Sequence, residues 1–122
     1  MKMKVKVNLA HELAKFTGTE EWFRHSLNRK MTYTEGVQFF AENAGEGAYW
    51  LLDIIATEGM EIHAKEQFVG IKLKVESHSA WLELNDGNNN ILLSKKINYT
   101  DCPDGEWKFY LIDNVMLLTS EY

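Results

Sequence analysis

Residues 48–56 read Ala-Tyr-Trp-Leu-Leu-Asp-Ile-Ile-Ala, the longest apolar run of the 122-residue chain. The run is too short to cross a bilayer, and Asp53 interrupts it. Because apolar side chains occupy almost every position, the pattern predicts a helix that is buried at the centre of the fold. We expect Trp50 in the core, and Asp53 beside Tyr49 and Thr57 at helical spacing.

A second helix is predicted directly upstream of this run. Thr34 followed by Glu35 is typical of a helix N-terminus, with a capping hydroxyl and an acid in the first turn. An apolar stripe follows, made of Val37, Phe40, Ala41 and Ala44. Gly45-Glu46-Gly47 then interrupts the pattern and separates this helix from the central one.

The N-terminal segment predicts a further helix, which we expect to end near Gly18. Its apolar residues recur at helical spacing: Val5, Leu9, Leu13 and Phe16. Asn8 is a suitable N-cap if this helix starts late, so the basic residues before it form either the helix start or an arm. Residues 20–27 fit a short strand or a turn of helix, and we favour the strand.

The C-terminal half has the alternation that is typical of strands. In residues 68–75, apolar side chains share one face, and Lys72 and Lys74 share the other. Two hairpins are predicted after this strand: residues 80–84 with 91–99, and residues 107–112 with 115–118. We therefore expect an α+β fold, an antiparallel sheet of about four or five strands with N-terminal helices packed on one face. We expect it to form a single domain over residues 1–122.

Composition indicates a globular protein that folds without disulfides. Hydrophobic residues make up 45%, aromatic residues 12% and charged residues 25% of the chain. Cys102 is the only cysteine, and no apolar export signal follows the first lysines, so we expect a reducing, cytoplasmic location. No membrane partner is expected.

The net charge of −5 is unevenly distributed along the sequence. Residues 1–30 have a net charge of +4, residues 31–70 of −6 and the remainder of −3. An acidic chain with a basic N-terminal quarter is not an obvious nucleic-acid binder, because phosphate affinity needs clustered Lys and Arg. Direct nucleic-acid binding is therefore not expected, although a contact with RNA stays open.

The chain contains residue types that occur in catalytic and metal sites, but they are not spaced as such sites require. His11-Glu12 is not followed by a second histidine at the helical position, and the other histidines are scattered. Cys102 lies between Asp101 and Pro103, an acidic setting that disfavours a thiolate. We therefore predict no catalytic residue, no metal and no cofactor.

Asp53 is the best lone candidate for a functional carboxylate, because it is a charge within an apolar helix. We favour the interpretation that it points to solvent or caps a backbone amide, since buried carboxylates are rare without a partner. The alternative is an enzyme with an unrecognised site around Asp53 and Arg24-His25.

The segment Glu20–Lys30 is the best candidate for a protein interface. It combines aromatic and arginine anchors with a charged rim, the blend found at interface hot spots, in Glu20, Glu21, Trp22, Arg24, Arg29 and Lys30. The alternative is that Trp22 belongs to the core and that the charges are solvated.

Several blocks of the chain resemble a family of small, uncharacterised proteins of bacteria, their phages and mobile elements. The blocks are Phe16-Thr17-Gly18-Thr19-Glu20, Arg24-His25, Tyr33-Thr34-Glu35-Gly36-Val37, Ala48-Tyr49-Trp50-Leu51-Leu52-Asp53, Lys72-Leu73-Lys74-Val75, Asp86-Gly87-Asn88, Tyr99-Thr100-Asp101 and Leu117-Leu118-Thr119-Ser120-Glu121-Tyr122. The resemblance carries over no catalytic residue. It implies a small cytosolic protein borne by a mobile element, a setting that includes counter-defence activities such as inhibition of CRISPR effectors.

Three functions from different classes follow. The first is a non-catalytic protein-binding inhibitor, acting on a host defence complex such as an RNA-guided CRISPR effector nuclease or its guide-RNA complex. The second is an accessory or structural module that forms a homodimer through an exposed sheet edge. The third is the enzyme with a site near Asp53. The missing nucleophile, metal and phosphate motifs argue against the third, so we favour the inhibitor, as a monomer or a homodimer.

Overall fold

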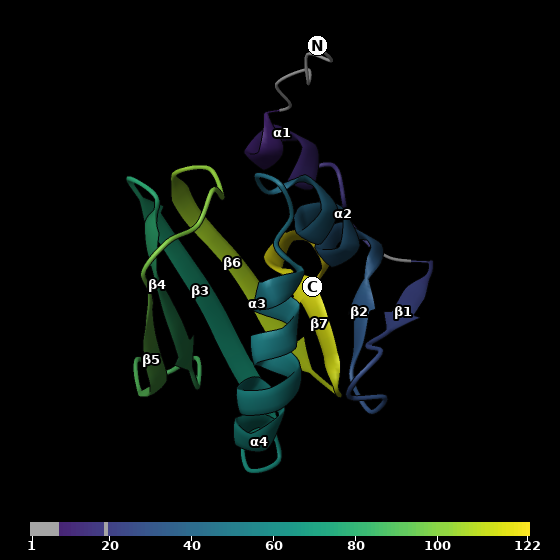
Figure 1. Cartoon of the computed structure of the whole chain (residues 1–122). Coiled ribbons are helices and arrows are strands. Elements are labelled where there is room, and N and C mark those ends of the chain that lie inside the picture. The colour runs from purple at the N-terminus through teal and green to yellow at the C-terminus, as the bar shows by residue number, and fades with distance from the viewer. Residues whose placement is uncertain (1–7, 19) are drawn as a thin grey trace.

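The computed structural model describes residues 8–18 and 20–122 and shows an α+β fold (Figure 1). Its helical elements are α1 (Leu9–Leu13), α2 (Glu35–Asn43), α3 (Tyr49–Ile54), the π-helical segment η1 (Ile55–Gly59), α4 (Met60–His63) and the 3-10 turn η2 (Thr119–Glu121). Its strands are β1 (Trp22–Arg24), β2 (Thr32–Thr34), β3 (Phe68–Glu76), β4 (Ser79–Asn85), β5 (Ile91–Ile97), β6 (Gly105–Ile112) and β7 (Val115–Leu118). Within these described residues, no helix is long and apolar enough to span a membrane.

The strands of the described part of the chain form one seven-stranded sheet, in the order β1-β2-β7-β6-β3-β4-β5. Neighbouring strands run antiparallel except β2 and β7, which are parallel. The expectation of an antiparallel sheet of four or five strands behind N-terminal helices is therefore wrong. The strand β2 was not expected, because its three residues are too few for an alternation signal, and it joins β1 to the rest of the sheet.

Turn residues with left-handed backbone close two of the hairpins. Ser77 and His78 between β3 and β4 have φ angles of 50° and 66°, and Asp113 and Asn114 between β6 and β7 have φ angles of 52° and 65°. Two successive positive φ angles are typical of the tight turn that matches the twist of paired strands. Both predicted hairpins, β4 with β5 and β6 with β7, are confirmed.

Two helix N-termini are capped as the sequence indicates. Thr34 Oγ1 accepts a hydrogen bond from the Val37 N–H at 3.3 Å, and Asn8 Oδ1 accepts one from the His11 N–H at 3.1 Å. These bonds satisfy backbone donors that a helix leaves unpaired in its first turn. The predicted start of α2 is therefore confirmed, and of the alternatives left open for the N-terminal helix, the late start with Asn8 as its cap is observed.

The N-terminal predictions need two corrections. The helix α1 ends at Leu13 rather than near Gly18, and the part of the prediction that rests on Val5 lies outside the described residues. In residues 20–27 the favoured strand is confirmed, but only for Trp22–Arg24.

The predicted central helix is present, but only one of its sides is buried. Leu51 and Leu52 are fully buried, whereas Tyr49 is 42% exposed. Trp50 is half-buried and packs against the margin of the core, so its predicted place inside the core is wrong. The helical path also continues past Ala56 through η1 and α4 (Figure 1); η1 still contributes buried residues, whereas α4 has none.

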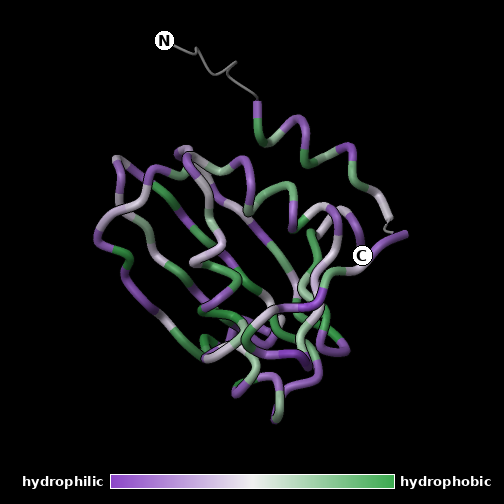
Figure 2. Tube along the Cα trace, turned by 45° about the vertical axis from the view of Figure 1, so that its right-hand side comes forward, coloured by the Kyte–Doolittle hydropathy of each residue, from purple (hydrophilic) through white to green (hydrophobic). Residues whose placement is uncertain are grey.

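Alternate residues of the long strands are buried, which gives the sheet two different faces. In β3, Val69, Ile71, Leu73 and Val75 are buried, as predicted. The tube in Figure 2 changes repeatedly between green and purple along the strands at its left, the pattern expected when one face meets a core. We call the side of the sheet that points away from α2 and α3 the open face.

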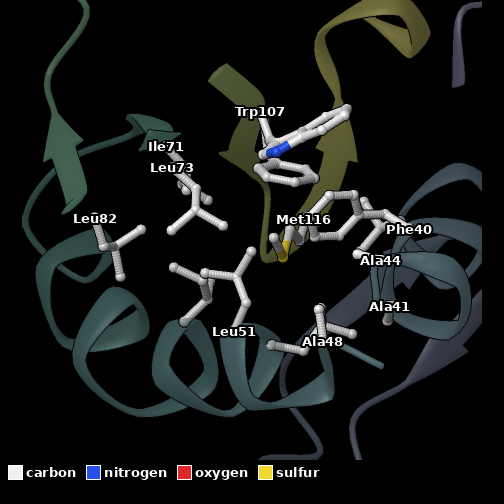
Figure 3. Close-up of a cluster of buried hydrophobic side chains, with 14 of the residues drawn as sticks. Phe40, Ala41, Ala44, Ala48, Leu51, Ile71, Leu73, Leu82, Trp107 and Met116 are labelled. Carbon is white, nitrogen blue, oxygen red and sulfur yellow. The ribbon is translucent and has the colours of Figure 1, made fainter. Parts of the chain in front are cut away.

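The core fills the space between the helices and the other face of the sheet. Leu51 of α3 and Phe40 of α2 point toward side chains from β3, β4, β6 and β7 (Figure 3). The Phe40 ring lies edge-on to the Phe109 ring, with 5.0 Å between their centroids. The helices are therefore held on one face by apolar packing.

Candidate functional site

The open face carries lysines and aromatic rings. Residues paired directly across neighbouring strands point to the same side of a sheet, so the strand register identifies the members of this face. Its charged and aromatic members are Trp22, Arg24, Phe68, Lys72, Lys74, Glu76, Trp81, Glu83, Lys96, Glu106, Lys108 and Tyr110.

A large share of the positive charge lies on this face. The chain has 13 Lys and Arg residues, of which Lys2, Lys4 and Lys6 precede the described residues. Five of the ten described bases lie on the open face, but only three of the 18 acids do. A protein with a net charge of −5 thus presents one face that carries five bases and three acids, a net charge of +2.

Trp81 occupies the middle of a row of residues that runs across three strands. It is paired with Lys74 of β3 on one side and with Lys96 of β5 on the other. Its side chain is 54% exposed, and adjacent strands lie about 4.8 Å apart. The row therefore presents an accessible indole flanked by two cations.

A neighbouring row places two lysines opposite each other. Lys72 of β3 is paired with Lys108 of β6, and like charges in such positions destabilise a sheet. Lys72 has compensation, because its Nζ lies 3.6 Å from Glu106 Oε1 and Glu83 is its partner on β4. Within the described part of the chain, Lys108 makes no ion pair.

A shallow depression of about 530 Å³ lies beside these rows. Gly70 lines it, and an added Cβ there would come within 2.5 Å of Asn85 Oδ1, so a side chain at this position would require Asn85 to move. Phe68 and Tyr110 line it with ring centroids 4.9 Å apart, and Lys108 lines it as well. Its size is within the usual range of small-molecule sites, and its wall combines aromatic carbon with amide and ammonium groups.

The predicted interface residues do not form one patch. Trp22 and Arg24 lie on the edge strand β1 and belong to the open face. Trp22 is 54% exposed, so the alternative that it belongs to the core is wrong. Arg29 and Lys30 are exposed in the loop that follows, and the Arg24 guanidinium donates a hydrogen bond to the Arg29 carbonyl.

Glu20 and Glu21 are held on a different part of the surface. The backbone N–H groups of both donate to Glu35 Oε1 of α2, at 3.3 Å and 2.9 Å. Both residues line a hollow together with Phe16, Phe39 and other residues of the helix side. The predicted segment is therefore split between the open face, a loop and the helix side.

The structure brings His25 and Asp53 together, the two residues that the enzyme alternative named. His25 is buried, and its Nε2 lies 2.8 Å from Asp53 Oδ1. Its Nδ1 accepts hydrogen bonds from the backbone N–H groups of Leu27 and Asn28, each at 3.1 Å. Asn28 also donates from its side chain to the Ala56 carbonyl at 2.7 Å, so this cluster ties the loop after β1 to the helical segment.

The hydrogen bonds of His25 decide what it can do chemically. Both partners of Nδ1 are donors, so this nitrogen carries no proton, and the proton lies on Nε2 and is donated to Asp53. No ring nitrogen is left to accept a proton from a substrate. Asp53 itself is 56% exposed, in agreement with the favoured interpretation that it faces solvent.

The environment of Cys102 makes its thiol unreactive. Burial, and after it the nearby charges of Asp101 and Asp104, raise the pKa of the thiol to about 12. A thiol with this pKa is protonated at neutral pH and is a poor nucleophile. Among the described residues, no group of three or more His, Cys, Asp or Glu side chains is placed to hold a metal ion.

The open-face lysines and Trp81 were not among the residues that the sequence singled out. Alternation does place Lys72 and Lys74 on the outer side of β3, and the same period applies to Trp81 in β4. The signal that was missing is strand order, because β6 pairs with β3 rather than following β5 in the sheet.

Comparison with known proteins places the chain in a family. No significant match was found among curated proteins or among solved structures. The sequence model of a family of unknown function, DUF6876, matches residues 7–122. This match covers most of the sequence and agrees with the resemblance to an uncharacterised family. The chain therefore belongs to this family of unknown function, DUF6876.

Proposed function

We propose that the chain is a non-catalytic binding module that contacts its partner through the open face. The observation that carries the proposal is the gathering of bases and exposed aromatic rings on one face of an acidic protein. Exposed aromatic residues surrounded by charge are typical of interaction surfaces, and complementary charge raises both specificity and association rate.

Two observations support a role without catalysis. Both ring nitrogens of His25 are occupied by structural hydrogen bonds, and the Cys102 thiol is protonated at neutral pH. These are the side chains that general-base or nucleophilic catalysis would most readily use. The third alternative, an enzyme with a site near Asp53, is therefore not favoured.

The finer proposal is an inhibitor from a phage or mobile element that acts in the cytosol on a host defence complex, such as an RNA-guided CRISPR effector nuclease. Its support is the resemblance of the sequence blocks, together with a surface suited to a charged partner. Trp22 and Arg24 would extend the contact to the β1 edge of the sheet.

Co-purification with a reconstituted effector and its guide RNA tests this proposal. We expect one copy of the chain per complex and inhibition that saturates at that ratio. Paired changes on the open face, Trp22→Ala with Arg24→Glu or Lys74→Glu with Lys96→Glu, should weaken binding at least tenfold. Lys65→Glu, at an exposed position after α4, is the matched control and should bind normally. Inhibition by substoichiometric amounts, or normal binding by both folded double variants, would contradict the proposal.

A homodimer through a sheet edge is the second candidate, and the edge strand β5 bears on it. This strand carries Lys95 and Lys96, and lysines on an edge strand oppose pairing with a second copy. We therefore favour a monomer. Sedimentation velocity at micromolar concentration should give a single species of 14.2 kDa, whereas a species of twice that mass would favour the dimer.

A further inference from the structure

We propose that the open face binds single-stranded nucleic acid, with a base stacked on Trp81 and phosphates placed against Lys72, Lys74, Lys96 and Lys108. The inference rests on the proposed function and names the chemistry of the partner. In a guide-RNA complex, the contact would then be made to exposed RNA rather than to protein alone.

The kind of charge on the open face favours phosphate over a protein surface. Four of its five bases are lysines on β3, β5 and β6, and lysine is depleted at protein–protein interfaces while it is common at phosphate contacts. Lys72 is paired across the strands with Lys108; Glu106 compensates Lys72, but Lys108 makes no ion pair within the described residues, so it is the lysine of this pair that is free to meet an anion. The open-face charge is thus complementary to a phosphate backbone.

The aromatic residues are placed as stacking surfaces. Trp81 is exposed between Lys74 and Lys96, so a base on the indole would bring its own phosphates toward one lysine or the other. The depression beside Gly70 is lined by the Phe68 and Tyr110 rings. The Tyr122 ring is largely exposed, and its centroid lies 5.4 Å from that of Tyr110. Stacking on sheet aromatics with a basic surround is how sequence-tolerant single-strand binding is achieved.

Glu83 provides a sharp test because it lines the depression and is paired across the strands with Lys72. Its carboxylate opposes an incoming phosphate. The variant Glu83→Gln removes this charge with little change of shape, so it should bind single strands more tightly. A cationic peptide on the same face would instead lose affinity.

Fluorescence anisotropy with labelled 12-nucleotide oligouridylate and oligothymidylate tests the inference. We expect micromolar binding at low salt, with a log–log salt slope near −3 if about four phosphates are neutralised at ~0.7 each. Trp81→Ala should lose about tenfold or more in affinity, whereas Trp81→Phe should retain most of it. The double variant Lys74→Gln with Lys96→Gln should also lose at least tenfold, and Lys65→Gln should not. The two oligonucleotides distinguish an RNA-selective site from one that accepts either sugar.

The outcomes separate this inference from the proposed function. No binding of either oligonucleotide at 50 mM salt, or binding that the Trp81 and lysine variants leave unchanged while they fold normally, overturns the inference. If those same variants still lose binding to an effector complex, the open face binds protein, and the proposed function stands without the inference. If the chain binds neither oligonucleotide and also does not bind the effector complex, both the inference and the proposed function are wrong. Circular dichroism melts establish that each variant is folded.

Discussion

At the scale of single residues, His25 shows how a residue that looks catalytic is held in a structural role. It is buried, and the three hydrogen bonds of its imidazole ring join the loop after β1 to α3. A neutral imidazole can serve both sides at once, because one nitrogen accepts and the other donates. The close approach to Asp53 is therefore explained without a reaction.

The first prediction concerns this pair. His25→Ala leaves the Leu27 and Asn28 N–H groups unpaired, so the free energy of unfolding should fall by about 2–4 kcal/mol. Asp53→Asn keeps an oxygen acceptor for Nε2 and should cost less than about 1 kcal/mol. Urea unfolding of both variants checks this. A larger loss for Asp53→Asn than for His25→Ala would contradict the inferred proton position.

The second prediction concerns Cys102. Because burial and then Asp101 and Asp104 raise the pKa of the thiol to about 12, the native protein should react slowly with a disulfide reagent at pH 8, and the unfolded chain quickly. Native and urea-unfolded samples followed at the same pH give the comparison. Equal rates would show that the thiol is exposed and ionised.

The raised pKa of Cys102 also sets a direction for stability against pH. The unfolded thiol loses its proton near pH 8.5 while the folded one keeps it up to about 12, so the unfolded state binds fewer protons between these values. Stability should therefore be unaffected by this group below pH 8 and fall by up to ~1.4 kcal/mol per pH unit above pH 9. Cys102→Ser should show a shallower alkaline slope, and an identical slope would contradict the assignment.

At the scale of elements, the C-terminal turn η2 is joined to the start of α2. Glu121 of η2 accepts hydrogen bonds from Thr34 Oγ1 at 2.6 Å, from the Leu118 N–H at 2.9 Å and from the Gly36 N–H at 3.3 Å. A carboxylate at a helix N-terminus also interacts favourably with the helix dipole. This contact helps to place β2 beside β7, the parallel pair of the sheet.

The third prediction follows from that contact. Glu121→Ala should lower the free energy of unfolding by about 2–3 kcal/mol, since it removes an acceptor that is shared by three donors. Glu121→Gln keeps an oxygen and should lose less. The exposed neighbour Ser120→Ala is the control; its hydroxyl makes only a long hydrogen bond, 3.5 Å, to the Leu13 carbonyl, so this variant should unfold almost as the parent does. The denaturation midpoints of the three variants test this prediction. An unchanged midpoint for Glu121→Ala would show that the C-terminal turn does not stabilise the start of α2.

Elements could be predicted from the sequence where their signals are local. Alternation in residues 68–75, the turn at Asp113-Asn114 and the cap at Thr34 all belong to short windows, and the structure confirms each. The strand β2 could not be predicted in this way, because its partner on one side is β7 at the other end of the chain. Trp50 was misplaced because an apolar run does not state which of its sides meets solvent.

At the scale of the whole molecule, the two faces of the sheet have different chemistry. One face is covered by α2 and α3 over an apolar core, and the other carries half of the described bases and few of the acids. The candidate site could not be found along the sequence, because its lysines lie on three strands that only the sheet order brings together. The aromatic and arginine residues of the segment Glu20–Lys30 led the sequence prediction there instead.

The most direct test of the open face is a lysine footprint of the bound protein. The chain is treated with an amine-acetylating reagent alone, with saturating 12-nucleotide oligouridylate, and with the purified effector complex, and the labelled sites are read by mass spectrometry. In whichever complex forms, we predict that acetylation slows at least threefold at the four open-face lysines, Lys72, Lys74, Lys96 and Lys108. Lys15 and Lys65 should be acetylated at the same rate as in the free protein. Protection that is confined to Lys15 and Lys65, with the four open-face lysines reacting at their free rates, would contradict the assignment of the open face as the binding surface.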